Sequence, residues 1–467
     1  MPAEADRAAP HAAVEAAKQF LSTFKTTGKT PGLILVAVSG GSDSKGLLLA
    51  LHEAIMRGGL SAFSLSACTI DHALRPESAD EARAVAAFCA ERGIRHSVRR
   101  WQGEKPATGI QAAARAVRYS LLADAAQEMA ALCLVTGHTA DDQAETITMR
   151  QGRSEPDAPG LAGMAAGVLV DRRAWVLRPF LSLRRAEIRD YLKARGEGWL
   201  DDPSNSNSSF ERVRVRHSMG GDIRAAMDVF VDAGEARRRS SERAASLLGT
   251  QVTVFEGLAA RLDRALVADM ANPDCRRAVL AVTAVIGGRP YLAGRETARR
   301  LTAFLTGGEG GRMTAGRVVF DVRRSGAYLY REARDLPEIV VQPGQKEIWD
   351  GRFLVANDSP ESIVVGAGGE TAELRARLIA AGLPEPVTKR AVKSALTWAP
   401  AQPPEERPDA PLSLPSTPRI ESSISLYDTF LPCFDLMMAN SIATLFGRDR
   451  YLAPPVHDVL TEKTAWA

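Results

Sequence analysis

The chain has 467 residues and nearly balanced charges, with 59 basic and 56 acidic residues and a net charge of +3. This length allows roughly two to four domains, and a hydrophobic content of 45% is enough to build a sizeable core. The charge balance gives no global sign of nucleic-acid binding, and the absence of an uncharged apolar run of about 18 residues argues against a membrane span.

Strands and helices are predicted to alternate up to residue 194. Amphipathic helical spacing over 12–26 precedes the apolar run 33–38, which is typical of a strand buried on both faces of a parallel sheet. Further strands are predicted at 64–70, 95–101, 132–136 and 175–177, and helices at about 45–56, 78–92, 110–129, 141–149 and 183–194. This alternation predicts an α/β fold with a doubly wound parallel sheet, whose ligands bind beyond the carboxyl ends of the strands.

Two more parts are predicted after a first domain at 1–217. A mainly helical second domain is expected at 218–335, because residues 220–306 have helical spacing and residues 307–331 return to short strands with glycine turns. The C-terminal region, 336–467, is expected to be a small α+β region with a proline-rich linker or long surface loop at 399–419.

The cysteines and the N-terminus both favour a cytoplasmic protein. No two cysteines form a Cys-x-x-Cys pair, so a disulfide framework or a thiolate metal site is disfavoured. Reduced thiols in the core are expected instead for Cys68, Cys89, Cys133, Cys275 and Cys433. The first twenty residues carry acidic side chains and lack the apolar region of a signal peptide.

A glycine- and serine-rich loop lies between the first predicted strand and the helix expected from Lys45. Glycines let backbone N–H groups approach an anion closely, and a helix N-terminus adds donors and partial positive charge. These features predict a phosphate site made by Ser39, Gly40, Gly41, Ser42, Asp43 and Ser44. Because Asp43 would repel phosphate, we expect a Mg²⁺ ion between the two. The alternative is an ordinary turn between strand and helix.

This loop resembles the Ser-Gly-Gly-x-Asp-Ser signature of the PP-loop ATP pyrophosphatases, a superfamily with a Rossmann-like fold. The resemblance implies that ATP is cleaved to AMP and pyrophosphate, and that a carbonyl-type oxygen is adenylated before a nucleophile displaces AMP. A loop that clamps the departing pyrophosphate would stabilise the charge that develops on it.

Four further segments are similar in order and spacing to one family of this superfamily, bacterial tRNA(Ile)-lysidine synthetase. They are 71–75 (DHALR), 114–119 (ARAVRY), 136–146 (TGHTADDQAET) and the stretch from Arg178-Pro179 to Arg216. With the loop, they cover roughly residues 33–217, whereas the chain beyond about 340 shows no comparable match.

The resemblance implies a ligase that forms a carbon–nitrogen bond. ATP would activate the 2-carbonyl oxygen of the wobble cytidine of tRNA(Ile) with a CAU anticodon, and the amine of free L-lysine would attack that carbon to form lysidine. AUA would then be read in place of AUG. The expected cofactors are ATP and Mg²⁺, no membrane partner is expected, and a homodimer is left open.

Candidate catalytic residues follow from the third segment. His138, Asp142 and Glu145 would share one helix face if the helix begins near His138. Their carboxylates could hold Mg²⁺, with Asp43 and Asp142 as ligands, or bind the ammonium of lysine and take its proton. The alternative is a solvated acidic helix start favoured by the helix dipole.

Two further sets of residues are candidates for substrate binding. Arg115 and Arg118, three residues apart on a predicted helix, would meet phosphate or the lysine carboxylate, and Arg118 is counted with the catalytic set. Asp71 and His72 end a predicted strand and would lie near the ribose or adenine of ATP. Solvated or purely structural roles are the alternatives for all four.

Arginine alternates with valine near the end of the first domain. If this segment is extended, Arg212, Arg214 and Arg216 point the same way and would contact the phosphate backbone of tRNA. The alternative is a solvated charged strand or helix.

Three other functions compete with this interpretation. A PP-loop enzyme that thiolates a tRNA base would use paired cysteines, which the sequence lacks. An amidotransferase-type ligase would carry a glutaminase module, for which no room exists before the loop. A nucleotide sensor with a degenerate site is disfavoured because Ser39, Asp43, Ser44 and Asp142 are intact.

Overall fold

The computed structural model describes residues 11–24, 32–74, 78–151, 162–200, 214–215, 223–401 and 417–457. The chain forms two compact units. Unit 1 comprises Met1–Arg239, Phe430–Phe434 and Leu452–Ala467, and unit 2 comprises Ser240–Thr429 and Asp435–Tyr451. The three-part division at 217 and 335 stays a prediction.

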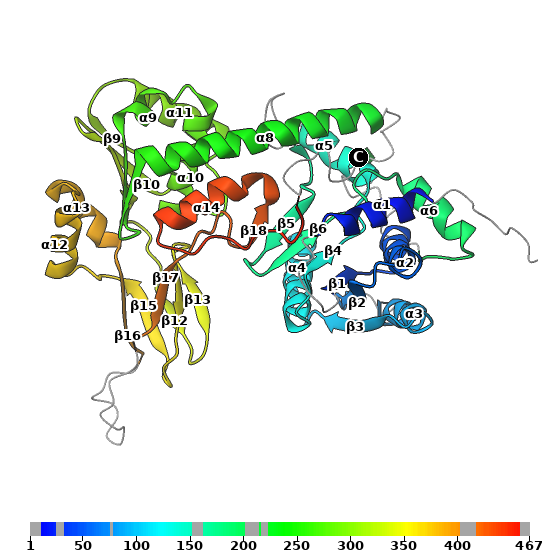
Figure 1. The fold of residues 1–467 in the computed structure, drawn as a ribbon. Coiled ribbons are helices and arrows are strands. Elements are labelled where there is room, and N and C mark those ends of the chain that lie inside the picture. Colours follow the sequence, from blue (N-terminus) through cyan, green and yellow to red (C-terminus); the bar gives the residue numbers. More distant parts are fainter. Residues whose placement is uncertain are drawn as a thin grey trace, which may run out of the picture. The chain divides into compact units, whose positions relative to one another are not determined.

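Unit 1 is built on a seven-stranded sheet in the order β18-β5-β6-β4-β1-β2-β3 (Figure 1). Five of its strands are parallel: β1 (Gly32–Ala37), β2 (Phe63–Asp71), β3 (Arg95–Arg100), β4 (Cys133–Val135) and β6 (Ala174–Leu177). The central strand β1 buries Ile34, Leu35 and Val36 completely, which is why its sequence is continuously apolar. The predicted α/β fold with a parallel sheet is confirmed.

Two antiparallel strands at one edge of this sheet were not predicted. They are β5 (Gly167–Val170), which pairs with β6, and β18 (Phe430–Pro432), which pairs with β5. β18 is separated from β5 by more than half of the chain, and each strand is too short for a clear alternation in its sequence. The indole nitrogen of Trp175 in β6 also donates to the carbonyl of Leu452, at 3.0 Å.

Helices cover both faces of the sheet, with α2 and α3 on one face and α4 on the other (Figure 1). The helices of this unit are α1 (Ala12–Ser22), α2 (Ser42–Arg57), α3 (Ser78–Ala90), α4 (Ile110–Glu128), α5 (Ala140–Gln151) and α6 (Arg185–Ala194). β1 lies between β2 and β4, so successive strands leave β1 in opposite directions. This topological switch point is where ligands bind in doubly wound sheets.

Unit 2 combines helices with three antiparallel sheets. The five-stranded sheet runs β7-β8-β11-β10-β9 and is accompanied by α9, α10 and α11. Its elements are β7 (Val252–Phe255), β8 (Ala259–Leu262), α9 (Arg264–Ala268), α10 (Pro273–Ile286), α11 (Arg295–Thr306), β9 (Gly311–Ala315), β10 (Val318–Arg323) and β11 (Gly326–Arg331). The hairpin β7–β8 interrupts a segment that was predicted to be helical. It was missed because each of its strands has only four residues, which is too short for a clear alternation.

The rest of unit 2 forms two three-stranded sheets, β12-β15-β16 and β13-β14-β17. The strands are β12 (Ile339–Val341), β13 (Lys346–Trp349), β14 (Phe353–Ala356), β15 (Ile363–Ala367), β16 (Leu396–Pro400) and β17 (Arg419–Ser422). This part of the unit also contains α12 (Ala372–Ala380), α13 (Glu385–Ala391), the 3₁₀ turn Val392–Ser394 and α14 (Leu436–Leu445). The 3₁₀ turn Cys433–Asp435 lies where the chain passes from unit 1 to unit 2. The predicted proline-rich linker falls mostly outside the described residues, between β16 and β17.

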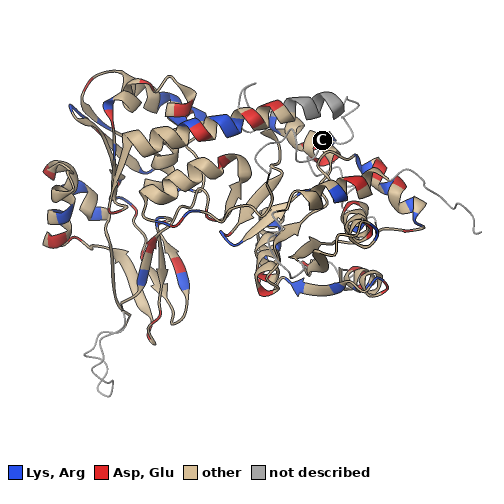
Figure 2. Cartoon of the chain, viewed as in Figure 1, with Lys and Arg blue, Asp and Glu red and all other residues tan. Residues whose placement is uncertain are grey.

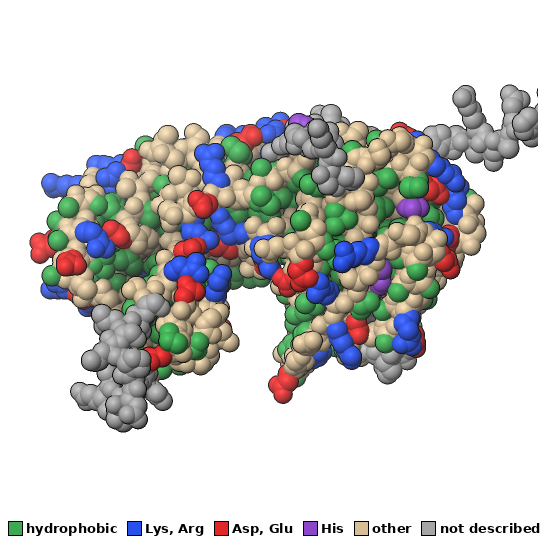
Figure 3. Space-filling model, turned by 60° about the horizontal axis from the view of Figure 1, so that its bottom comes forward, with side chains coloured by type: hydrophobic (Ala, Val, Ile, Leu, Met, Phe, Trp, Pro, Cys, Tyr) green, Lys and Arg blue, Asp and Glu red, His purple; other side chains and the backbone are tan. Residues whose placement is uncertain are grey.

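Charged side chains of opposite sign are interleaved. Both basic and acidic residues occur along α8 (Ile223–Gln251), where Arg238 pairs with Glu235 at 2.6 Å (Figure 2). On the face drawn in Figure 3, basic and acidic side chains again lie among one another. Within the described ranges, no helix is long and apolar enough to span a membrane.

Candidate functional site

The phosphate loop follows β1 at the switch point of the sheet. Gly40 has φ +83°, and a Cβ there would lie 2.7 Å from the side chain of Leu200, so only glycine fits. Gly41 is the N-cap of α2, which begins at Ser42 and not at Lys45 as expected. Since α2 has no side-chain cap, the N–H groups of its first turn are available to an anion.

The loop is held in shape by its own serines. The backbone N–H of Ser39 donates to Oγ of Ser44 at 3.1 Å, and the two hydroxyl oxygens lie 3.2 Å apart. Lys45 does not serve as a phosphate-binding lysine here, because its Nζ pairs with Glu197 at 2.9 Å and donates to the carbonyl of Gly198 at 2.6 Å. The polar groups left to meet phosphate are the serines and the backbone.

Three predicted catalytic carboxylates converge on a residue that sequence analysis missed. Arg185, the first residue of α6, donates from Nε to Asp43 at 2.9 Å and from Nη2 to Asp142 at 3.0 Å. Its Nη1 lies 3.7 Å from Oε1 of Glu145. The structure therefore brings Asp43, Asp142 and Glu145 together, as predicted, and places a guanidinium between them.

The electrostatics of this cluster depend on burial. Burial raises the pKa of Asp43, and the nearby charge of Arg185 only partly offsets that rise. Burial works against the charge of Arg185 as well, but Asp142 and Asp43 outweigh it and raise the pKa of its guanidinium. Arg185 thus offsets part of the cost of an ionised Asp43 that is held away from water.

Backbone contacts fix the cluster beside the loop. A Cβ on Gly137, which follows β4, would lie 2.6 Å from the carbonyl oxygen of Asp43, so the two segments touch. Asp142 accepts hydrogen bonds from the N–H and the hydroxyl of Thr139, both at 2.9 Å. The backbone N–H of Arg185 donates to Asp141 at 2.8 Å.

His138 lies elsewhere than expected. The helix α5 begins at Ala140, so His138 precedes it and does not share a helix face with Asp142 and Glu145. Its Nδ1 lies 2.9 Å from the hydroxyl of Thr136. The predicted shared face required a helix that begins near His138. Since Thr139 directly precedes the first residue of the helix, His138 is not part of that face.

Asp71 and His72 lie at the end of β2. Asp71 accepts from the N–H of Ala73 and the hydroxyl of Ser78, both at 2.8 Å, which is a structural role in that turn. Burial and the charge of Arg118 lower the pKa of His72, which favours its neutral form. Its buried Nδ1 makes no hydrogen bond among the described residues.

Arg115 and Arg118 form a second cluster on α4. Their guanidiniums lie 5.1 and 5.4 Å from the ring centre of the buried Tyr119. Although burial opposes ionisation of Tyr119, Arg178, Arg115 and Arg118 lower the pKa of its hydroxyl to about 8. Arg178, which is 1% exposed, therefore completes a positively charged group that sequence spacing alone did not indicate.

The predicted tRNA contacts are largely outside the described residues. Arg212 and Arg216 fall there, whereas Arg214 is exposed and helical, not extended. The proposed alternation along an extended segment is therefore not seen at Arg214.

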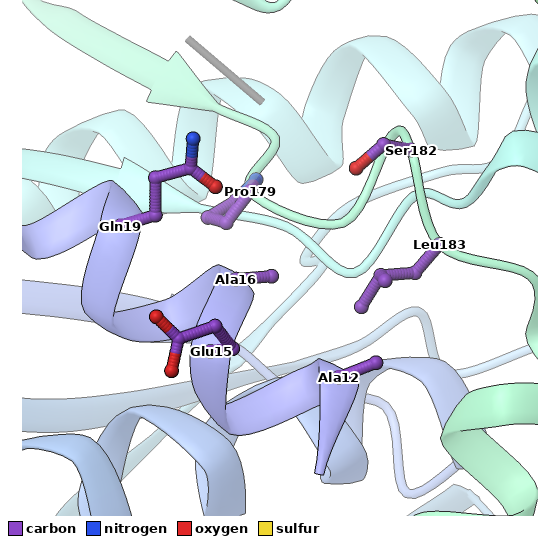
Figure 4. A pocket seen from close by; sticks show the side chains of 7 residues that line it. All are labelled: Ala12, Glu15, Ala16, Gln19, Pro179, Ser182 and Leu183. Atoms are coloured by element: carbon purple, nitrogen blue, oxygen red, sulfur yellow. The ribbon is translucent and has the colours of Figure 1, made fainter. Parts of the chain in front are cut away.

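Figure 4 shows a separate pocket of about 210 Å³ between α1 and the segment after β6. Its lining consists of Ala12, Glu15, Ala16, Gln19, Pro179, Ser182 and Leu183. None of the predicted site residues lines it, so the candidate site remains the edge formed by the loop and the carboxylates.

The cysteines are those of a core, as predicted. All five are buried and free of disulfides, and burial raises the pKa of Cys89 to about 11. Thiols with raised pKa values are poor nucleophiles.

Comparison with known proteins agrees with this geometry. Residues 12–222 match the family model described as a PP-loop domain. The tRNA(Ile)-lysidine synthase of Rhizobium meliloti is 51% identical over 97% of this chain and 99% of its own length. That of Mesorhizobium japonicum is 39% identical over 90% of this chain and 94% of its own.

Solved structures are similar only in part. A U34-tRNA thiolase from Methanococcus maripaludis is 16% identical, with a TM-score of 0.39 over 47% of this chain and 77% of its own. The relatives of high identity span nearly the whole chain, and on that ground the chain belongs to the tRNA(Ile)-lysidine synthase family.

Proposed function

We propose that this chain adenylates the 2-carbonyl oxygen of the wobble cytidine of tRNA(Ile) with a CAU anticodon and joins free L-lysine to that carbon. AMP and pyrophosphate leave, and the modified tRNA reads AUA in place of AUG. Its class, a ligase that forms a carbon–nitrogen bond, follows from the family. The observation that carries the proposal is the carboxylate cluster beside the phosphate loop at the switch point.

The first step assigned to the loop is the grip on ATP. The free N–H groups at the start of α2 and the hydroxyls of Ser39, Ser42 and Ser44 are donors for phosphate oxygens. As pyrophosphate departs it gains charge, and donors already in place stabilise that charge without reorganising. Asp71 and His72 remain candidates for the nucleoside end, with Asp71 already engaged in its turn.

The second step assigned to the site is lysine binding. Asp142 and Glu145 already lie beside the positively charged guanidinium of Arg185. Their carboxylates are therefore suited to bind the ammonium group of lysine. A carboxylate there can also accept the proton that the attacking amine loses. Arg115 and Arg118 offer guanidiniums for the lysine carboxylate.

The donor set fits Mg²⁺ as well. Asp43 and Asp142 offer hard oxygen ligands beside the phosphate site. Within the described ranges no group of three His, Cys, Asp or Glu side chains is placed to hold a metal, so water and phosphate oxygens would complete the coordination. When bound, Mg²⁺ would neutralise phosphate charge next to Asp43.

A tRNA-thiolating activity is not favoured. The five cysteines are buried and free, and none belongs to a Cys-x-x-Cys pair. Cytoplasmic location and a homodimer stay predictions.

Formation of lysidine is tested by mass spectrometry of tRNA(Ile) incubated with ATP and isotope-labelled lysine. We expect the tRNA to gain the mass of the labelled lysine less one water, and AMP release to require tRNA and lysine together. A tRNA with uridine at the wobble position is the matched control and should remain unmodified. A reaction that proceeds equally well with glutamine, cysteine or a persulfide in place of lysine would contradict the proposal.

Combined replacement of Arg212, Arg214 and Arg216 by alanine should weaken tRNA binding. If each contacts one phosphate, the slope of log Kd against log salt should fall by roughly 2 to 3. The matched control replaces three exposed cations of unit 1, Arg57, Arg83 and Lys193. Equal tRNA affinities and salt slopes for the two triple variants would mean that Arg212, Arg214 and Arg216 are solvated and do not contact tRNA.

A further inference from the structure

Three turns of unit 2 meet with their backbones in contact. One follows α10 at Gly287 and Gly288, another joins β9 to β10, and the third follows β13 at Asp350 and Gly351. A Cβ on Gly288 would lie 2.0 Å from the carbonyl oxygen of Asp350, and one on Gly351 would lie 2.3 Å from that of Gly288. Both glycines also have positive φ values, +61° and +72°, so no larger residue fits and the turns are locked together.

This junction buries more positive than negative charge. Asp350 accepts two hydrogen bonds of 3.1 Å from Arg331 and one of 2.6 Å from Arg352. It also forms an ion pair with Arg317. The side chains of Arg331, Arg352 and Asp350 are 1%, 2% and 0% exposed. Burial lowers the pKa of Arg352 to about 10, and three arginines contact this one carboxylate.

The excess charge reaches the surface at Arg317. Its side chain is 26% exposed, and burial together with the charges of Arg331 and Arg289 lowers the pKa of its guanidinium. Arg289, just after Gly288, is exposed and has no acidic partner among the described residues. The charge of Arg289 thus acts on that of Arg317, beside a cluster in which three arginines contact a single carboxylate.

The backbone at Arg317 has a conformation that is unusual for a residue other than glycine. Arg317 has φ +68° and follows Gly316, with φ +59°, in the two-residue turn between β9 and β10. Both positions of such a turn need positive φ, and the second is usually glycine because other residues are strained there. Strained residues persist where the surrounding structure and a function retain them.

We propose that Arg289 and Arg317 form a binding site for a phosphate of the RNA backbone. A guanidinium fork matches phosphate oxygens, and Arg289 offers one. Both Nη atoms of Arg317 already donate, to the carbonyl of Gly287 and to Asp350, so Arg317 contributes mainly its charge. An anion here would balance the charge that Asp350 leaves uncompensated. An RNA phosphodiester is favoured over free phosphate because Tyr291, two residues beyond Arg289, is 80% exposed and offers a ring face on which a base can stack. This inference rests on the proposed function, in which tRNA is the substrate.

The test measures tRNA(Ile) binding by the full-length protein over a range of salt concentrations. Arg289→Ala should weaken binding roughly threefold to tenfold and reduce the salt slope by about 1. Arg289→Lys should recover part of the lost affinity, and Tyr291→Ala should weaken binding with an unchanged salt slope. The matched control is Arg299→Ala, in which an exposed arginine of the same unit, paired with Glu296, is lost.

The outcomes separate this inference from the proposed function. Wild-type protein that neither binds tRNA(Ile) nor forms labelled lysidine would overturn both. Active wild-type protein with Arg289→Ala indistinguishable from Arg299→Ala would overturn the inference alone. If inorganic phosphate protects the wild type but not Arg289→Ala from unfolding while tRNA affinity is equal in both, the site takes a small anion and the assignment to RNA is wrong.

Discussion

AMP formation should fall by roughly 10²- to 10³-fold when Asp43 is replaced by asparagine. Asparagine keeps the size and shape of the side chain but removes the charge that faces Arg185 at 2.9 Å. In the proposed reaction that charge holds a cation against the phosphates, so its loss should act on the chemical step. The fold should survive, because Arg185 keeps its ion pair with Asp142.

The pH dependence provides a second readout for the same residue. Burial raises the pKa of Asp43 above the ordinary value of 3.8. Activity that needs the ionised carboxylate should therefore be lost, as pH falls, at a higher pH than for an ordinary aspartate. For stability the sign is opposite: a raised carboxyl pKa contributes stability below the unfolded pKa, and that contribution is lost as pH rises through the folded value.

Single-turnover measurement of AMP release, with tRNA and lysine saturating, separates the chemical step from binding. Asp141→Asn is the matched control, since Asp141 lies next to Asp142 on α5 but accepts the backbone N–H of Arg185 and not the guanidinium bond that Asp43 receives. Asparagine can accept that bond, so its rate should stay near the wild-type value. A wild-type rate for Asp43→Asn would remove the carboxylate from the mechanism.

Arg185 provides positive charge beside the aspartate of the phosphate loop. An aspartate inside a phosphate loop requires a cation, and the sequence predicted Mg²⁺ in that role. The structure shows a guanidinium between Asp43 and Asp142, and the predicted Mg²⁺ stays a prediction. Any Mg²⁺ or lysine ammonium that binds these carboxylates must compete with Arg185 or displace it, so this arginine sets the charge that a ligand meets.

The parts of the fold that could be predicted are those encoded locally. The strand β1 is one unbroken apolar run, and the helix after it carries regular apolar spacing, so both were readable. The strands β5 and β18 were missed because each has three or four residues and one lies far along the chain from its partner. Their pairing is decided by tertiary contact and leaves almost no local pattern.

The site shows the same division. Spacing within one helix predicted that His138, Asp142 and Glu145 lie together beside the loop. Asp142 and Glu145 both lie at Arg185, which also contacts Asp43 of the loop, whereas His138 precedes the helix. Arg185 was missed although it lies within the stretch from Arg178 to Arg216 that resembles the family, because its partner Asp43 is 142 residues away and no periodicity links them. His138 was misplaced by two residues at a helix start, where boundaries are least certain from sequence.

Replacement of Asp350 by asparagine should destabilise unit 2 by about 3–5 kcal/mol, because it removes the carboxylate from a buried ion cluster and leaves its cations unpaired. Asn tolerates the positive φ of 53° at this position, so the change isolates the charge from backbone strain. Arg331 and Arg352, almost fully buried, would then keep only neutral acceptors, which are backbone carbonyls and the hydroxyl of Ser394. Hydrogen exchange of the amides from Trp349 to Val355 in urea reports this loss locally.

The matched control for that substitution is Asp335→Asn, in which an exposed aspartate of the same unit with φ 51° loses its charge. An exposed position without such a cluster should change stability by no more than about 0.5 kcal/mol. Equal protection of the Trp349–Val355 amides in the two variants would mean that the backbone carbonyls alone compensate the arginines. In that case the charge excess at Arg317 would also be smaller than the count of side chains indicates, because the same carbonyls would screen it.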